Sequence, residues 1–179
     1  MASTDANPLL PKENAVRLGA MLDALRATLD PKRGAAWHGG PTPMMAVRGV
    51  SAAQARWLPA RRRHSIWELT LHIAYWDYAV RRRFEPDSAA GFPHSPANWP
   101  AVPDRANEKA WAGARALLAR EHDLLVRAVR RVKASRWNRR MPKGRWTYGD
   151  TIVGIAAHDV YHTGQIQLLK RLWGARGRS

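Results

Sequence analysis

Two histidines separated by four positions are the residues of this chain whose type and spacing best suit chemistry. His158 and His162 lie in the segment Ile155–Ile166, which reads IAAHDVYHTGQI. On a helix, residues four apart lie one above the other on the same face, so their ring nitrogens can converge on one point. A third histidine, His72, sits within an earlier helical stretch, Ser65–Phe84. Three neutral imidazoles with open coordination positions are typical of a reactive metal site rather than a structural one.

The surroundings of this pair decide how it is interpreted. A His-x-x-x-His pair alone is a weak signal, because exposed histidines at helical spacing are common. This pair lies in the most apolar helical segment of the chain, 152–169, and buried imidazoles need partners such as a shared metal ion. The zinc-peptidase pattern His-Glu-x-x-His is absent, since Asp159 stands where that pattern has Glu. Peptidase chemistry is therefore not expected.

Two polar neighbours could act beside the histidines, and each has a plainer alternative. Gln165, one turn beyond His162, could bond a metal-bound water or a substrate, or it could pack and position a neighbouring ring. Glu68, one turn before His72, could orient that histidine. It also completes the capping box Ser-x-x-Glu that starts at Ser65, and this role already explains it.

Two aromatic residues and several other polar side chains are weighed in the same way. Trp76 and Tyr161 could line a cavity above the metal, although aromatic residues at such positions are more often plain core. Asp159 projects about 100° away from His158 on the helix, so we expect it to face solvent or to pair with an arginine. The remaining histidines are expected to be surface or hydrogen-bonded groups: His38, His64, His94 and His122.

Four helical patterns must position these residues. Apolar residues recur at helical spacing over 13–29, 65–84, 104–132 and 147–172. Capping boxes mark the starts of the second and fourth patterns, at Ser65–Glu68 and Thr147–Asp150. The first two links are long and rich in Gly and Pro, and the first contains one short helical piece, Ser51–Trp57. Four amphipathic helices around one core, with room for long crossover connections, predict an all-α four-helix bundle.

Composition places the chain among globular domains. With 179 residues, of which 45% are hydrophobic, it is long enough to bury a core as one domain. We expect a disordered tail over 1–12 and a single domain over 13–179. No run approaches the ~18 apolar residues of a membrane span and no secretory signal is recognisable, so a cytoplasmic protein is expected. The absence of cysteine excludes thiolate ligands and any thiol nucleophile of the chain's own.

The net charge of +16 has two interpretations. Lys and Arg neutralise phosphates, so an anionic partner such as nucleic acid is the first. A coding bias is the second, since most of the 30 basic residues are Arg and the chain is rich in Ala. The basic residues are scattered, and no recognition helix, zinc finger or stacking platform accompanies them. Nucleic acid is therefore expected to bind only through non-specific electrostatic attraction.

Two segments resemble the signatures of one protein family. The segment 63–76, RHSIWELTLHIAYW, resembles the second-helix signature of DinB-like (DinB/YfiT) proteins. The segment 158–166, HDVYHTGQI, resembles the last-helix signature of the same family, His-x-x-Tyr-His-x-Gly-Gln. The resemblance extends from about Val16 to Trp173. It implies a four-helix bundle in which a divalent metal is bound by one histidine of the second helix and two of the last: His72, His158 and His162.

The resemblance also implies an activity. Members of this superfamily include thiol-dependent S-transferases and isomerases that use low-molecular-weight thiols. A metal-dependent transferase of this kind is the first hypothesis, with hydrolysis as another metal-dependent reaction, and no catalytic residue is assigned. Zinc is the first choice of ion, with nickel, iron or manganese as alternatives. The alternative functions are a non-catalytic metal-binding stress-response protein and, less favoured, a basic nucleic-acid-binding bundle. Several relatives form homodimers, so a homodimer with a small-molecule substrate is expected.

Overall fold

A computed structural model describes residues 39–86, 91–142 and 144–176 of the chain. Within these ranges the chain forms helices and no β-strand, apart from one isolated bridge between Arg140 and Thr147. The elements are α2 (Pro43–Ala46), α3 (Ala52–Arg56), α4 (Ile66–Phe84), α5 (Glu108–Arg131), the 3-10 helix η2 (Ala134–Arg136) and α6 (Tyr148–Ala175). The predicted all-α class is confirmed. The tail over 1–12, the predicted first helix over 13–29 and His38 lie outside the described residues.

Side-chain caps determine where two of the long helices start. At α4, the Glu68 amide donates to Ser65 Oγ over 3.2 Å, and the Ser65 amide donates to Glu68 Oε2 over 2.7 Å. Thr147 and Asp150 make the same reciprocal pair at α6, with both distances 3.0 Å. Such caps are worth about 1 kcal/mol each, because they satisfy amides that the first helical turn leaves without a partner. Both predicted capping boxes are confirmed.

The limits of α5 and α6 differ slightly from the predicted ones. α5 begins at Glu108 rather than at residue 104, because the Asn107 side chain caps it by accepting a 3.0 Å hydrogen bond from the Ala110 amide. α6 continues to Ala175, beyond the predicted end at residue 172. Although α6 is 28 residues long, neither it nor any other described helix is apolar enough to cross a membrane.

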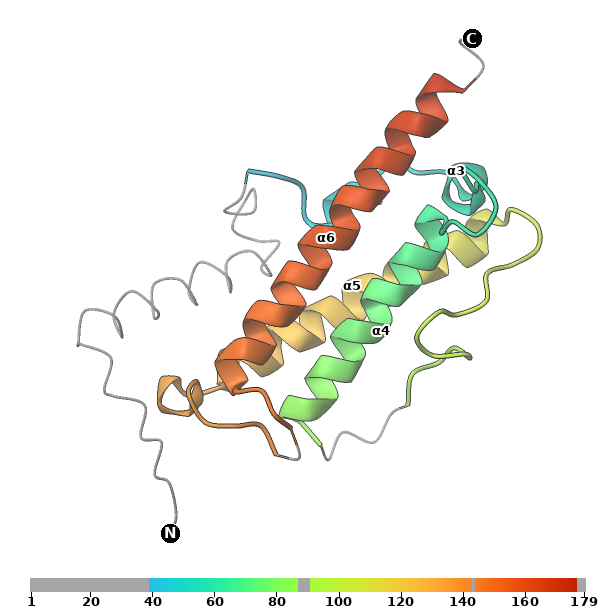
Figure 1. The fold of residues 1–179 in the computed structure, drawn as a ribbon. Helices are drawn as coiled ribbons and strands as arrows, with labels where there is room; N and C mark the ends of the chain where they lie inside the picture. The colour runs from blue at the N-terminus through green and yellow to red at the C-terminus, as the bar shows by residue number, and fades with distance from the viewer. Residues whose placement is uncertain (1–38, 87–90, 143, 177–179) are drawn as a thin grey trace.

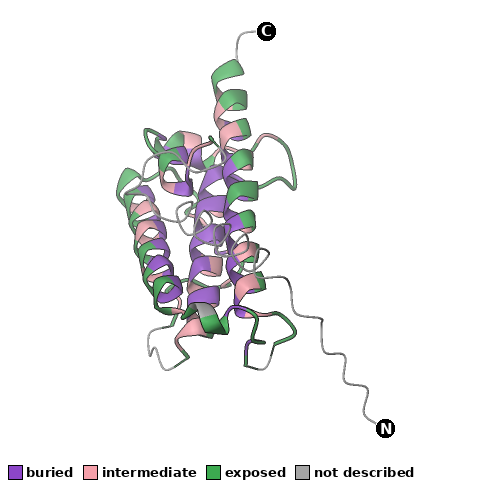
Figure 2. Ribbon diagram, turned by 90° about the vertical axis from the view of Figure 1, so that its left-hand side faces the viewer, coloured by how far each residue is buried: buried purple, intermediate pink, exposed green. Residues whose placement is uncertain are grey.

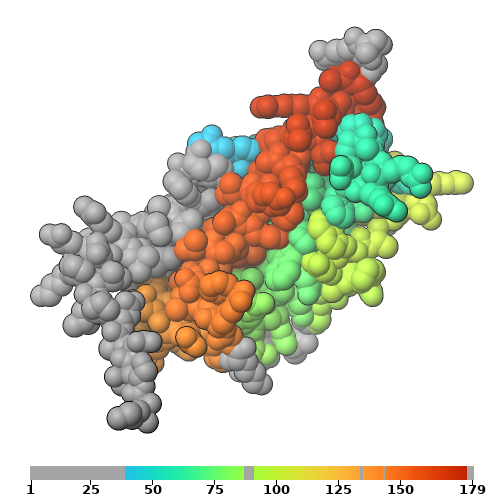
Figure 3. All heavy atoms as spheres, viewed as in Figure 1, coloured from blue at the N-terminus to red at the C-terminus, as the bar shows by residue number. Residues whose placement is uncertain are grey.

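α4 lies between the other two long helices. It packs against α5 on one side and against α6 on the other (Figure 1). The short helices α2 and α3 sit at one end, where α2 contacts α6 and α3 contacts α4. The link from α4 to α5, drawn in yellow-green in Figure 3, packs beside α4 and next to α3. This link, although irregular, therefore lies close enough to α4 to contribute to any site built there.

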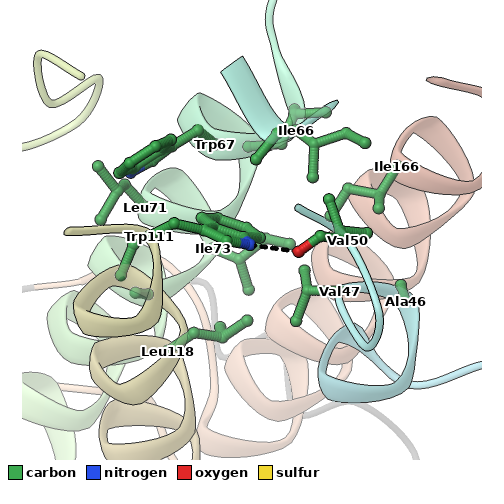
Figure 4. Close-up of a cluster of buried hydrophobic side chains, with 14 of the residues drawn as sticks. Ala46, Val47, Val50, Ile66, Trp67, Leu71, Ile73, Trp111, Leu118 and Ile166 are labelled. Atoms are coloured by element: carbon green, nitrogen blue, oxygen red, sulfur yellow. Dashed lines mark hydrogen bonds between the residues drawn. The ribbon is translucent and has the colours of Figure 1, made fainter. Parts of the chain in front are cut away.

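Two apolar clusters hold these helices together, one toward each end. The first surrounds Trp111, whose indole N–H donates to the Val50 carbonyl oxygen over 2.6 Å (Figure 4). The second joins the C-terminal halves of α4 and α5 to the start of α6, with Leu125 and Ile152 fully buried. Figure 2 shows the buried positions facing inward along each helix. Burial of a large apolar side chain stabilises the fold by about 1.5–3 kcal/mol, so these clusters supply much of the driving force.

A layer of buried polar side chains separates the two clusters. Its members are Asp77 on α4, Glu121 and His122 on α5, and Asp159 on α6. Each follows residues of one cluster and precedes residues of the other along its helix. Polar groups buried at such a place destabilise the fold unless they have partners, so their partners bear directly on function.

Candidate metal centre

Three histidines from two helices converge on one point. His72 comes from the middle of α4, and His158 and His162 lie one turn apart on α6. One ring nitrogen of each lies within 4.8 Å of those of the other two. The Nε2 atoms of His72 and His158 are 3.2 Å apart, and the ring centroids of His158 and His162 are 4.4 Å apart. The structure therefore brings together the three residues that the sequence singles out, here called the histidine triad.

The outer nitrogen of each ring already has a partner. His72 Nδ1 lies 2.7 Å from a backbone oxygen of the link between α4 and α5, and His162 Nδ1 lies 2.7 Å from Gln165 Oε1. His158 Nδ1 lies 3.4 Å from Asp159 Oδ1. All three partners are hydrogen-bond acceptors, so each Nδ1 carries the proton and donates it. This tautomer leaves a lone pair on each Nε2, facing the point of convergence.

The arrangement of the three inner nitrogens fits a divalent cation. With no proton on either Nε2, the 3.2 Å contact between His72 and His158 sets two lone pairs against each other. Two nitrogens bound at about 2.0–2.1 Å to one tetrahedral ion would be about 3.3 Å apart, which is close to this spacing. His162 adds a third donor, and at least one coordination position would stay open for water or substrate. The donor set does not distinguish zinc from nickel or iron, because imidazole binds all of them.

The link between α4 and α5 holds His72 in place. Trp99 stacks on the His72 ring, with centroids 3.8 Å apart and planes inclined by 9°. The exposed His64 ring stacks on the same indole at 3.7 Å. Asn98 contributes twice, because its backbone oxygen accepts from His72 and its Oδ1 accepts from the Trp76 indole over 2.9 Å. Outer partners of this kind orient a ligand ring before the metal arrives.

Burial keeps the triad neutral. It lowers the pKa of His158 to about 3, with further contributions from the neighbouring His162 and His72. Burial is also the main reason that the pKa values of His72 and His162 fall below the usual 6.5, against the opposing effects of their hydrogen bonds to Asn98 and Gln165. Neutral imidazole is the form that binds a metal, so the site is prepared for binding near neutral pH.

The metal-free protein is expected to lose stability as the pH falls below about 6.5. In the unfolded chain a histidine titrates near 6.5, whereas the pKa of His158 in the folded protein is about 3. Between these values the unfolded state binds more protons, so the free energy of unfolding decreases as the pH is lowered through this window. Chemical denaturation at a series of pH values measures the slope.

The variant His158→Gln isolates this contribution. Its free energy of unfolding should depend less steeply on pH in this window than that of the wild type, and the same change at the exposed His94 is the control. Asp77 and Asp159 contribute to the pH dependence of the free energy of unfolding with the opposite sign. Both proteins contain these aspartates, so their contribution cancels when the wild type and the variant are compared. Burial raises the pKa values of these two carboxyls, which favours the folded state at low pH. Equal slopes in the wild type and His158→Gln would contradict the prediction.

Gln165 and Glu68 both act on neighbouring groups rather than at the point of convergence. Gln165 accepts from His162 Nδ1, so it positions that ring from the outside. Glu68 Oε2 accepts from both the amide and the hydroxyl of Ser65. The other carboxylate oxygen of Glu68 lies 3.8 Å from His64. The plainer interpretation therefore accounts for each of the two residues.

Trp76 and Tyr161 differ in their surroundings. Trp76 is half-buried, its ring centroid lies 5.8 Å from that of His158, and it lines the neighbouring cavity. Tyr161 is 64% exposed, and its ring meets the edge of the His162 ring at 4.9 Å. The expectation of a core position is therefore wrong for Tyr161. Trp76 lines a cavity beside His158, and its role in a metal site stays a prediction.

Next to the triad lies a second buried group that the sequence interpretation misses. Asp77, His122 and Asp159 each place one donor atom within 4.8 Å of the other two. The expectation that Asp159 faces solvent or pairs with an arginine is wrong, because its side chain is only 3% exposed and points toward His122. Since His158 lies at the edge of the bundle, the rotation of about 100° to the next residue of α6 turns Asp159 inward. His122 is hydrogen-bonded rather than at the surface.

An interrupted apolar stripe is the signal that could have revealed this group. Asp77 stands one turn after Ile73 and one turn before Val80, on the face of α4 that is otherwise apolar. His122 interrupts the apolar stripe of α5 in the same way. An acid and an imidazole at core positions of two different helices indicate a polar group inside a bundle.

The helices that carry the triad match a known family. The sequence model of the DinB superfamily covers residues 44–166, which is more than half of the chain. The chain belongs to the DinB superfamily. The DinB match includes all three histidines of the triad, and it agrees with the all-α fold. No curated protein and no solved structure matches the sequence. DinB membership and the buried triad together fit a metal-binding protein.

Proposed function

We propose that this DinB-superfamily protein is a divalent-metal-dependent transferase that takes a low-molecular-weight thiol as co-substrate. The observation that carries the proposal is the convergence of three neutral imidazoles beside a cavity. His72, His158 and His162 would hold the ion, with zinc as the proposed metal. A bound divalent ion would lower the pKa of a thiol and so favour the thiolate, which is the nucleophilic form.

A cavity of about 670 Å³ adjoins the triad. His158 forms part of its wall, so a molecule in the cavity would lie next to this residue of the triad. Cavities of about 300–1,000 Å³ are the usual size for small-molecule sites. The wall is mainly apolar and aromatic, with Trp76 and Trp146 among its residues and Arg83 as a positive charge. This lining suits an electrophile or thiol with an apolar body and a small anionic group.

The chain's own residues would bind and orient the two co-substrates rather than transfer a proton. Asp150 is a carboxylate of the cavity wall, but its hydrogen bonds with Thr147 lower its pKa, which makes it a poor base near neutral pH. The thiol proton would therefore leave to solvent, and the electrophile would either release its leaving group as the carbon–sulfur bond forms or, in an addition, take the electron pair into its own double bond or ring. Because the chain contains no cysteine, the sulfur of the new carbon–sulfur bond must come from the co-substrate.

Turnover of metal-loaded protein tests the proposal. A panel of low-molecular-weight thiols is offered together with a panel of electrophiles, and formation of the carbon–sulfur bond is followed. We expect turnover that requires the metal and falls at least about 100-fold in His158→Ala, while His94→Ala keeps it. Metal binding without turnover in any pairing would favour the non-catalytic metal-binding alternative. Turnover that survives removal of the metal would contradict the proposal.

Several expectations from the sequence stay predictions. They are the homodimer, the cytoplasmic location, the single domain over 13–179 and the non-specific nature of any nucleic-acid binding. Light scattering after size-exclusion chromatography measures the first. The salt dependence of DNA binding measures the last, because phosphate contacts weaken steeply as salt is added.

A further inference from the structure

We propose that Asp77, His122 and Asp159 form a second divalent-cation site, buried in the core beside the histidine triad. Each of the three residues comes from a different long helix, and they meet in the polar layer between the two apolar clusters. Two carboxylates and one imidazole suit borderline or hard divalent ions such as Zn²⁺ or Mn²⁺. This second site does not depend on the thiol-transfer proposal.

The distances between the donor atoms suit a single ion. His122 Nδ1 lies 3.0 Å from Asp77 Oδ2 and 3.8 Å from Asp159 Oδ2. Metal–ligand bonds of about 2.0–2.2 Å place neighbouring donors about 3.0–3.6 Å apart. The first distance lies within this range, the second is slightly longer, and all three donor atoms lie within 4.8 Å of one another, so the side chains are close to the spacing of a coordination shell.

Although the two aspartates have a side-chain hydrogen-bonding contact with each other, two of the carboxylate oxygens accept no hydrogen bond from an N–H group. They are Asp77 Oδ1 and Asp159 Oδ2, both shielded from solvent. The two aspartates are 0% and 2% exposed, so bulk water does not reach them. Buried carboxylate oxygens normally accept hydrogen bonds, and an unsatisfied one is costly. A cation held by both oxygens of Asp77 and by Oδ2 of Asp159 would satisfy both atoms at once.

Asp77 and Asp159 both lie against His122, and Asp159 also lies against His158; neither histidine offers a positive charge while it is neutral. Glu121, the third carboxylate of the layer, accepts from Arg81 over 3.0 Å and from Arg120 over 2.7 Å. One divalent ion would balance Asp77 and Asp159 while His122 stays neutral. On binding, His122 would carry its proton on Nε2 instead of Nδ1 and so stay neutral, and the proton shared by the two carboxylates would leave to solvent. Without an ion, the two carboxylates would have to share a proton, and this proton-bridged cluster is the competing description.

Asp159 joins the second site to the triad. Its Oδ1 lies 3.4 Å from His158 Nδ1, while its Oδ2 faces His122. An ion held by Oδ2 would fix the orientation of this carboxylate and, through it, of the His158 ring. Carboxylates that hold a metal-binding histidine by its outer nitrogen commonly act in this way.

Metal counting in refolded full-length protein tests the second site. Because all three ligands are buried, the protein is unfolded in urea and refolded with excess Zn²⁺, and in a parallel sample with Mn²⁺, before dialysis. We expect about two ions per chain in the wild type with at least one of the two metals, and about one in Asp77→Asn, which keeps the shape of the side chain and removes its charge. Glu121→Gln is the matched control, since it changes a buried carboxylate outside the group, and it should keep both ions.

A second measurement separates this site from the triad and does not require Asp77→Asn to fold. In His72→Ala, the ion of the triad should be lost, and one ion should remain that still raises the midpoint of thermal unfolding. A wild type that holds a single ion, retained in Asp77→Asn, would overturn the second site in favour of the proton-bridged cluster. Two ions in Asp77→Asn would also overturn it, because the second ion would then bind elsewhere. If neither Zn²⁺ nor Mn²⁺ shifts the midpoint of thermal unfolding of His72→Ala, the second site is likewise overturned.

Discussion

Replacing His162 with alanine is expected to lower the affinity for Zn²⁺ by more than about 100-fold at the triad. Loss of an outer partner of a metal-binding histidine costs about 10–100-fold in affinity, and loss of the ligand itself should cost more. The structure gives a further reason, since His162 supplies one of the three nitrogens that converge here among the described residues. Titration against a chromophoric chelator of known affinity measures the change.

A graded control sharpens this prediction. Gln165→Ala removes only the acceptor that His162 Nδ1 uses and leaves the ligand nitrogen in place. Its affinity should therefore lie between those of the wild type and His162→Ala. His94→Ala, which changes an exposed histidine, should bind as the wild type does. If His162→Ala binds as tightly as His94→Ala, His162 is not a ligand.

Replacing Trp111 with alanine is expected to reduce the free energy of unfolding by about 3–5 kcal/mol. The side chain is fully buried at the centre of the first apolar cluster, between α5 and the segment that carries α2 and α3. Its removal would leave a large cavity and would also leave the Val50 carbonyl without its 2.6 Å hydrogen bond. Urea denaturation followed by circular dichroism measures the loss.

Two further variants divide this effect into its parts. Trp111→Phe keeps much of the apolar volume and removes the N–H donor, so its loss should be clearly smaller than that of Trp111→Ala. Trp146→Ala removes an indole that is 51% exposed and should change stability little. A Trp111→Ala protein as stable as Trp146→Ala would show that the first cluster does not hold the fold together.

The features that could be predicted from the sequence are those set by local interactions. The capping boxes at Ser65 and Thr147 involve residues three apart in the sequence, so the sequence alone predicts where α4 and α6 start. The spacing of His158 and His162 likewise determines that they share a helix face. His72 could be assigned as the third ligand because it lies in a family signature. Its position in a helix alone would not have been enough.

The features that could not be predicted depend on contacts between distant parts of the chain. Asn98 and Trp99 hold His72 from a link whose path has no periodic pattern. Whether Asp159 points inward or outward depends on where α4 and α5 pack against α6, which the sequence of α6 alone does not contain. Sequence reasoning therefore reached the triad but missed the carboxylates beside it.

Anomalous diffraction from crystals of the zinc-loaded full-length protein, measured at the zinc absorption edge, tests the central claim most directly. The predicted result is a peak about 2.0–2.1 Å from the Nε2 atoms of His72, His158 and His162. A weaker or equal second peak among Asp77, His122 and Asp159 would accompany it if the buried site also fills. A map with zinc elsewhere, and no peak within bonding distance of the three Nε2 atoms, would contradict the account.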